Sequence, residues 1–99
     1  MAYKKQEETK VQKAIQNYIR SIGGYCFKEH ADMFSRAGIP DIICCVKGRF
    51  IGIEAKDGDN TASDLQIANG ILIKKAGGLF IIAKSVEEVQ NLLEKENLI

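Results

Sequence analysis

The chain has 99 residues, which suits one domain over residues 1–99 and leaves no room for a second hydrophobic core. A hydrophobic fraction of 45% excludes disorder, and no run of about 18 uncharged apolar residues is present that could span a membrane. The formal net charge of +1 excludes a strongly basic or acidic protein. One histidine argues against a zinc site or a Ser-His-Asp triad. The N-terminus carries no apolar core behind its basic residues, so we expect no secretory signal.

The small net charge is the sum of two unequal parts. Residues 1–56 carry ten Lys and Arg against six Asp and Glu, which gives +4. Residues 57–99 carry four lysines against seven acidic residues, which gives −3. This division indicates either two differently charged solvated surfaces or a nucleic-acid-binding face built from the first half.

The first predicted element is a helix over residues 6–22. Val11, Ile15, Ile19 and Ile22 recur at three- and four-residue steps, which is the period of one helical face. The two glycines at 23–24 end it, because glycine readily adopts the left-handed conformation found after helices. A short strand follows at residues 25–27. Residues 30–38 have no clear period, and we expect a loop that includes His30.

Residues 41–46 and 50–56 read as two strands of an antiparallel hairpin that turns at 47–49. The first strand is nearly continuously apolar, which predicts burial on both faces. The second alternates, with Ile51 and Ile53 on one face and Glu54 and Lys56 on the other. We expect the three cysteines to be reduced thiols in or near the core of a cytoplasmic protein, because their number is odd and no CxxC spacing occurs; they are Cys26, Cys44 and Cys45.

A second helix is predicted over residues 64–76, because Ser63 and Gln66 form a capping-box pattern. Its expected apolar stripe is Leu65, Ala68, Leu72 and Ala76. A buried strand at 79–83 and a helix at 86–96 follow; Ser85 caps that helix, and its apolar stripe is Val89, Leu92 and Leu93. The element order is therefore helix, three strands, helix, strand, helix. It predicts an α/β fold with helices covering a mixed sheet.

Three charged residues interrupt the apolar hairpin strands: Asp41, Glu54 and Lys56. Pairing residues at equal distances from the turn places Asp41 opposite residues 55–57, so the two carboxylates and the lysine converge. Carboxylates this close repel unless a cation lies between them, and hard oxygen ligands suit Mg²⁺ or Mn²⁺. The set predicts metal-assisted hydrolysis of a phosphodiester. The alternative is a charged cluster on an exposed sheet edge.

The segments Gly38-Ile39-Pro40-Asp41 and Glu54-Ala55-Lys56 resemble the motifs of the PD-(D/E)xK nuclease superfamily. Within it, the chain resembles the small virus-type replication–repair nuclease (VRR-NUC) family over residues 7–83. In that family a helical glutamate precedes these segments and a glutamine begins the next helix. The resemblance implies a restriction-endonuclease-like core of helix, three strands, helix and strand, followed here by a C-terminal helix.

The resemblance also implies roles for individual residues. Asp41, Glu54 and the backbone carbonyl of Ala55 correspond to the metal ligands, and Lys56 to the catalytic lysine that positions water. Glu8 corresponds to the glutamate that completes the site, directly or through a second metal, although Glu7 is adjacent and the register is open. Gln66 either points into the site or serves only as a cap. Gln12 is a weaker candidate one turn after Glu8, and either residue is otherwise an ordinary solvated helix residue.

The function implied is a Mg²⁺- or Mn²⁺-dependent endodeoxyribonuclease that is phage-like and structure-specific, acting on branched DNA or Holliday junctions. Symmetrical cutting of a junction needs two sites, so a homodimer is expected in the cytoplasm of a bacterial or phage-infected host cell. A non-catalytic nucleic-acid-binding module of the same fold is the alternative. Lys28, Ser35 and Arg36 are predicted to contact DNA. The surplus of apolar residues for so short a chain is compatible with a dimer surface; it includes Ile71, Ile73, Leu98 and Ile99.

Overall fold

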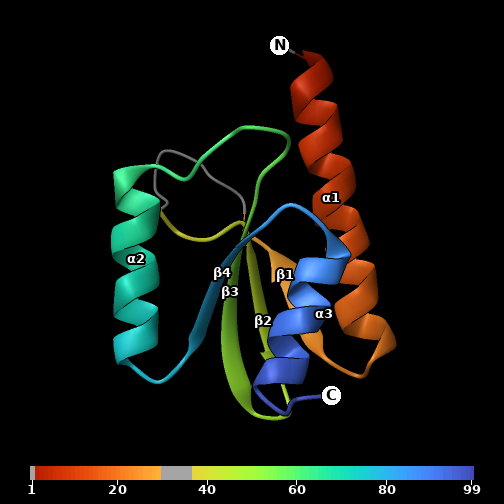
Figure 1. Ribbon diagram of the computed structural model, residues 1–99, viewed down its shortest axis with the longest axis vertical. Coiled ribbons are helices and arrows are strands. Elements are labelled where there is room, and N and C mark those ends of the chain that lie inside the picture. Colours follow the sequence, from red (N-terminus) through yellow and green to blue (C-terminus); the bar gives the residue numbers. More distant parts are fainter. Residues whose placement is uncertain (1, 30–36) are drawn as a thin grey trace.

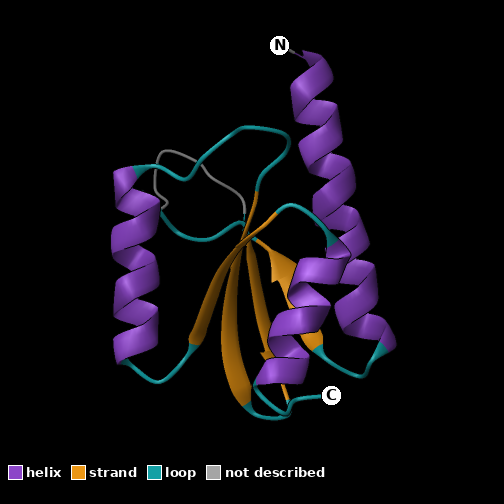
Figure 2. Cartoon of the chain, viewed as in Figure 1, coloured by secondary structure: helices purple, strands orange, loops and turns teal. Residues whose placement is uncertain are grey.

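The computed structural model describes residues 2–29 and 37–99, with side chains described from residue 7 onward. Three helices cover the two faces of one four-stranded sheet (Figures 1 and 2). The predicted element order is confirmed, and most bounds agree within two residues, although the first helix begins four residues earlier than expected. The elements are α1 (Ala2–Ser21), β1 (Tyr25–Lys28), β2 (Ile42–Val46), β3 (Arg49–Ala55), α2 (Asp64–Lys75), β4 (Leu79–Ala83) and α3 (Val86–Lys95).

The sheet has the strand order β1-β2-β3-β4. The first three strands form antiparallel pairs, whereas β3 and β4 are parallel and are joined through α2, as a parallel connection requires. Helices α1 and α3 lie on one face and α2 lies alone on the other (Figure 1). None of the three described helices combines the length and the apolar content needed to cross a bilayer.

The hydrophobic core lies between the sheet and the pair α1 and α3. The period that predicted α1 is confirmed, since Ile15 and Ile19 are fully buried in this layer, and so is the period of α3, since Val89 and Leu93 are buried there too. Burying each such side chain stabilises the fold by roughly 1.5–3 kcal/mol relative to its exposure. This core fixes the positions of β2 and β3, whose ends carry the candidate site.

The prediction that the first hairpin strand is buried on both faces is wrong. In β2, buried side chains alternate with side chains that are half-buried or exposed. Cys45 is one of the exposed residues, which also contradicts its expected place in the core. The strand buried on both faces is β3, where residues 51–55 are all buried. The reason is the covering helices: both strands lie inside the sheet, but α2 packs on β3 and β4 and does not contact β2, so only β3 has helices over both faces.

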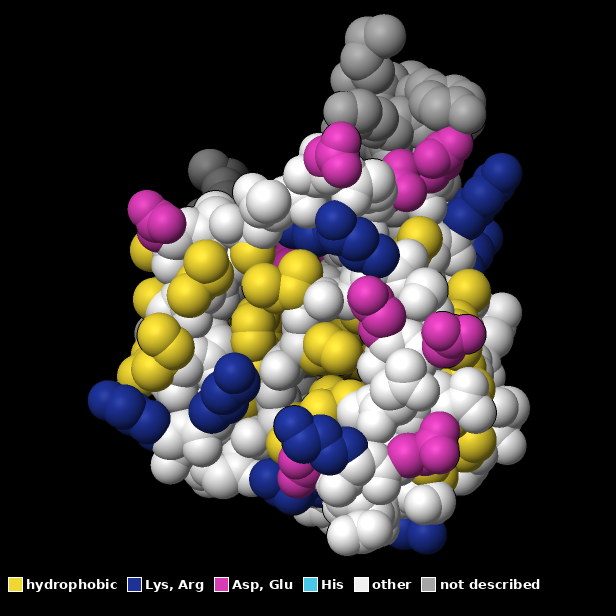
Figure 3. Space-filling model, viewed as in Figure 1, with side chains coloured by type: hydrophobic (Ala, Val, Ile, Leu, Met, Phe, Trp, Pro, Cys, Tyr) yellow, Lys and Arg dark blue, Asp and Glu magenta, His cyan; other side chains and the backbone are white. Residues whose placement is uncertain are grey.

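The apolar stripe predicted for α2 is also wrong. Leu65 and Leu72 are 57% and 52% exposed, and the residue that α2 buries is Gly70. A side chain at Gly70 would lie 2.4 Å from the ring of Phe80, so glycine allows α2 to approach β4 closely. The helix is therefore turned so that its inward residues are mostly polar or small, and large apolar side chains gather on the outside (Figure 3).

Candidate active site

The candidate site lies at the end of the sheet where β3 ends and β2 begins (Figure 1). A tight turn at Lys47 and Gly48, both with positive φ, makes Val46 pair with Arg49 and Ile42 pair with Ile53. Continuing this register places residue 41 opposite residue 54. The predicted convergence of the two carboxylates is therefore found, but the partner of Asp41 differs from the expected 55–57 because the turn has two residues instead of three.

Glu54 is the most deeply buried charged residue that the structure describes, with 1% of its surface exposed. Its Oε2 accepts a hydrogen bond of 2.7 Å from Nε2 of Gln66 and lies 3.4 Å from Nζ of Lys56. Its Oε1 is buried with no hydrogen-bond partner. A buried carboxylate with one oxygen unsatisfied is costly, and Oε1 can accept a contact from a ligand.

Burial and the neighbouring carboxylate change how Glu54 ionises. Desolvation by burial and, after it, the negative charge of Asp41 together raise the pKa of Glu54 to about 7. The ammonium group of Lys56 lowers the pKa and offsets these effects only in part. Asp41 and Glu54 are thus close enough to repel, which is the condition under which a cation between them stabilises both charges.

Asp41 is held by backbone. Its Oδ2 accepts a hydrogen bond of 3.1 Å from the N–H of Ala55. The preceding Gly38 has a φ of +84°, and a Cβ there would lie 2.6 Å from the carbonyl oxygen of Leu65 in α2. Asn69 adds a hydrogen bond to the carbonyl of Ala37. The Gly38 to Asp41 segment therefore rests against α2, which fixes where Asp41 begins β2.

Gln66 performs both of the roles that the sequence left as alternatives. Its Oε1 accepts from the backbone N–H of Ser63 at 2.8 Å, while Ser63 Oγ accepts from the N–H of Gln66, which completes the capping box. Its Nε2 donates to Glu54 at the same time. An amide has a donor end and an acceptor end, so one side chain can begin α2 and hold the buried carboxylate.

Comparison with solved structures places this arrangement in a known fold. A structure described as "VRR_NUC domain" superposes with a TM-score of 0.74 at 24% identity, covering 89% of this chain and 95% of the other. A second, described as "VRR_NUC domain protein", gives 0.69 at 24% identity, covering 88% and 84%. The chain has the VRR_NUC fold. No protein-family model and no curated protein matches the sequence.

The donor set at the end of β3 in this VRR_NUC fold fits a divalent cation. The unpartnered Oε1 of Glu54 and the carboxylate of Asp41 are hard oxygen donors, and Mg²⁺ is commonly held by one or two carboxylates together with water and phosphate. Across residues 2–29 and 37–99, no three His, Cys, Asp or Glu side chains gather around one point. A cation here would therefore rely on Asp41 and Glu54, with the carbonyl of Ala55 as a further predicted ligand.

Of the remaining predicted site residues, those that the structure describes lie outside the cluster of Asp41, Glu54 and Lys56. Glu8 is half-buried on α1 and lines a small cavity with Gln12 and Lys28, but it does not join Asp41 and Glu54 in one cluster. Ser35 and Arg36 fall outside the described residues. Sequence reasoning missed Asn69; its signal was the three-residue step from Gln66 to Asn69, two polar residues that share the inward face of α2.

The two roles of Gln66 can be separated by substitution. Gln66→Glu keeps an acceptor for the Ser63 N–H but replaces the donor to Glu54 with a second carboxylate, so we expect a loss of about 1–3 kcal/mol in unfolding free energy at pH 8. Protonation of the carboxyls should reduce this loss at pH 5. Ser63→Ala removes the cap alone and should cost about 1 kcal/mol at both pH values. Urea unfolding in EDTA measures the unfolding free energy of each variant at both pH values. If the losses in the two variants depended on pH to the same extent, Gln66 would not have the two separate roles described.

The raised pKa of Glu54 predicts a pH dependence of stability in the metal-free protein. The folded state holds a proton on Glu54 up to a pKa of about 7, whereas the unfolded chain releases it near the ordinary value of 4.5. The unfolding free energy should therefore fall as pH rises between these values, by about 1–3 kcal/mol relative to Glu54→Gln, which cannot ionise. Parallel urea titrations of both proteins measure the difference, and a difference that stays constant from pH 4.5 to 8 would show the expectation to be wrong.

Proposed function

We propose that this protein is a divalent-metal-dependent endodeoxyribonuclease. One observation carries the proposal: a buried glutamate with an unsatisfied oxygen lies beside a second carboxylate and a lysine at one end of a VRR_NUC fold. These residues are the ones that resemble the motifs of the PD-(D/E)xK superfamily. A structural ion pair alone gives no reason to leave Oε1 of Glu54 without a partner in the core.

The chain's own residues account for the positioning that phosphodiester hydrolysis needs. When bound by Asp41 and Glu54, Mg²⁺ or Mn²⁺ supplies positive charge that stabilises the charge developing on the phosphate oxygens. The Lys56 ammonium is held by Glu54 with 16% of its side chain exposed, so it can donate a hydrogen bond to the attacking water. Gln66 keeps the Glu54 carboxylate in place, and the Ala55 N–H keeps that of Asp41. The groups are thus fixed before substrate binds.

The substrate class follows from the family resemblance. We propose branched DNA, including Holliday junctions, as the substrate, and a phage-like protein acting in the cytoplasm of a bacterial or phage-infected cell. Lys28 lies at the end of β1 beside this end of the sheet, where a phosphate contact supports DNA binding.

Cutting both strands of a junction needs two sites, and the exposed face of α2 supports a homodimer. Leu65, Ile67, Ile71 and Leu72 are each 44–57% exposed. Leu72 is also one of the residues that line an apolar cavity of about 410 Å³ between α2 and the sheet. An apolar surface of this kind is typical of an interface, and a two-fold axis lets one patch cover the same patch on a second copy. The sequence offered four apolar residues for such a surface. Ile71 and Ile99 are exposed, and Ile73 is half-buried. Leu98 instead packs in the core, because the chain turns back after α3.

The nuclease proposal predicts metal-dependent cutting. Purified protein is incubated with labelled duplex, flap, splayed and four-way DNA in Mg²⁺ or Mn²⁺ and in EDTA. We expect cutting of branched substrates only with the metal. Lys56→Ala and Asp41→Ala should each lower the rate at least about 100-fold, because the first removes the group that positions the attacking water and the second removes a metal ligand.

Lys47→Ala is the matched control for these variants, since Lys47 is an exposed lysine in the turn at the opposite end of the sheet. It should cut at the rate of the unaltered protein. Binding without cutting by the unaltered protein would instead identify a non-catalytic nucleic-acid-binding module. Cutting that persists in EDTA would contradict the role given to the metal.

The homodimer proposal predicts that a charge on the outer face of α2 dissociates the protein. Ile71→Lys places an ammonium group in the proposed interface, where its desolvation is costly, and should shift the sedimentation coefficient from that of a dimer to that of a monomer. Ile99→Lys is the control, because Ile99 is 45% exposed but is the last residue of the chain and lies outside α2. A monomeric unaltered protein at micromolar concentration would refute the proposal.

A further inference from the structure

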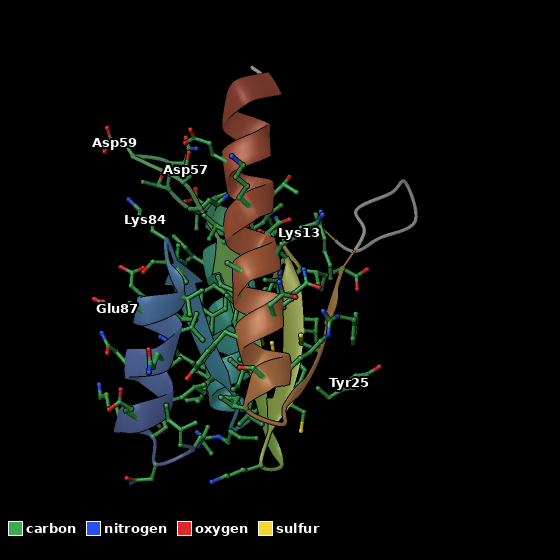
Figure 4. All side chains as sticks on the ribbon, turned by 90° about the vertical axis from the view of Figure 1, so that its right-hand side faces the viewer. Lys13, Tyr25, Asp57, Asp59, Lys84 and Glu87 are labelled. Carbon is green, nitrogen blue, oxygen red and sulfur yellow. The ribbon has the colours of Figure 1, made fainter. Side chains whose placement is uncertain are left out.

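A polar groove runs along α1 on the side that faces β1. It has a volume of about 410 Å³, and six of its lining residues come from α1 while Lys28 comes from β1. Three lining side chains are cationic, namely Lys13, Arg20 and Lys28, and none is a carboxylate. Figure 4 shows Lys13 on the β1 side of α1, while Asp57 and Asp59 lie on the opposite side. The groove is therefore a positively charged surface in a protein of nearly zero net charge.

The wall of this groove is ordered by side-chain hydrogen bonds at four-residue steps. Gln16 donates from Nε2 to the carbonyl of Gln12 at 3.4 Å, and Arg20 donates from Nη2 to Oε1 of Gln16 at 3.5 Å. Arg20 also donates to the carbonyl of Cys26 at 3.3 Å, which ties α1 to β1. Side chains that are already held lose less conformational entropy when a ligand binds.

Gln12 is an unexplained buried polar group in this groove. It is 8% exposed, and its Oε1 is buried with no hydrogen-bond partner. Rotation of the terminal torsion of Gln12 by 180° exchanges the amide oxygen and nitrogen, so the side chain can present either an acceptor or a donor at this point. A polar ligand in the groove would satisfy this oxygen.

The groove leads toward the candidate active site. A second cavity of about 290 Å³ shares Gln12 and Lys28 with it and adds Glu8. Lys28 pairs with Ile42, and the N–H of the next residue, Glu29, donates to the carbonyl of Asp41 at 2.7 Å. The cationic end of the groove is thus one residue away from Asp41 across the β1–β2 ladder. A backbone that crosses the end of the sheet can contact both places.

We propose that this groove binds the sugar–phosphate backbone of the nucleic-acid substrate outside the cleaved position, with Lys13, Arg20 and Lys28 contacting phosphate oxygens. The inference rests on the proposed function, because it places the same strand in the groove and at Asp41. It assigns to α1 the task of aligning the substrate. The anionic backbone matches three cations, and ordered polar side chains between them suit a repeating chain of phosphates and sugars.

The test uses the Lys56→Ala protein, which is expected to bind DNA without cutting it. Binding of fluorescently labelled four-way and duplex DNA is measured by anisotropy in Mg²⁺ over a series of NaCl concentrations. Adding Lys13→Gln and Lys28→Gln should weaken binding at least about tenfold at low salt and reduce the slope of log affinity against log salt by about 2, one for each lost phosphate contact.

The matched control adds Lys47→Gln and Lys95→Gln, which removes two exposed lysines from the far end of the hairpin and from the end of α3. This control should keep the parent's affinity and slope. Lys13→Gln alone, at a fully solvated position, should reduce the slope by about 1 and guards against a folding defect in the double variant. Equal losses in groove and control variants, or no DNA binding by the parent, would overturn the inference.

The two proposals fail separately. If the unaltered protein cuts DNA while the groove variants bind like the control, the nuclease proposal stands and the groove inference is wrong. If the unaltered protein never cuts DNA but its binding depends on Lys13 and Lys28, the groove binds nucleic acid and the nuclease proposal is wrong.

Discussion

The buried carboxylate of Glu54 is the constraint on which the rest of the structure depends. A charged group with 1% exposure must be satisfied by its neighbours, and each neighbour comes from a different part of the chain. Lys56, directly after β3, and Gln66, from α2, compensate the carboxylate, whereas Asp41, directly before β2, lies close enough to repel it. The fold brings three separate segments to one carboxylate and still leaves one of its oxygens unsatisfied.

The need of the buried Glu54 carboxylate for an amide donor explains the orientation of α2. A helix that packed its leucines inward would direct Gln66 away from Glu54 and leave the carboxylate without its amide donor. The observed helix buries Gly70 against Phe80 and turns Gln66 and Asn69 inward, so that one holds Glu54 and the other holds the segment before Asp41. The consequence is an outer face of leucines and isoleucines that is exposed to solvent. The site and the proposed dimer surface are thus two results of one rotation of α2.

The two faces of the sheet have different roles. The face covered by α1 and α3 holds the apolar core, and the face toward α2 holds the carboxylates. Helix α1 serves the core through Ile15 and Ile19 and presents Gln12, Gln16 and Arg20 to the groove beside β1. Positive charge therefore lies along α1, outside the core, and leads to the end of the sheet at which Asp41 and Glu54 meet.

The element order, the caps at Ser63 and Ser85, and the meeting of Asp41, Glu54 and Lys56 could be predicted from the sequence, because they follow from local periodicity, capping chemistry and hairpin pairing. Which strand is buried on both faces, and which side of α2 faces inward, could not be predicted in this way. Burial depends on what packs on each face, and a close helix–strand approach at a glycine or a polar bridge to a buried charge can outweigh an apolar stripe. For the same reason the joint role of Gln66 could be resolved only when Glu54 was in place.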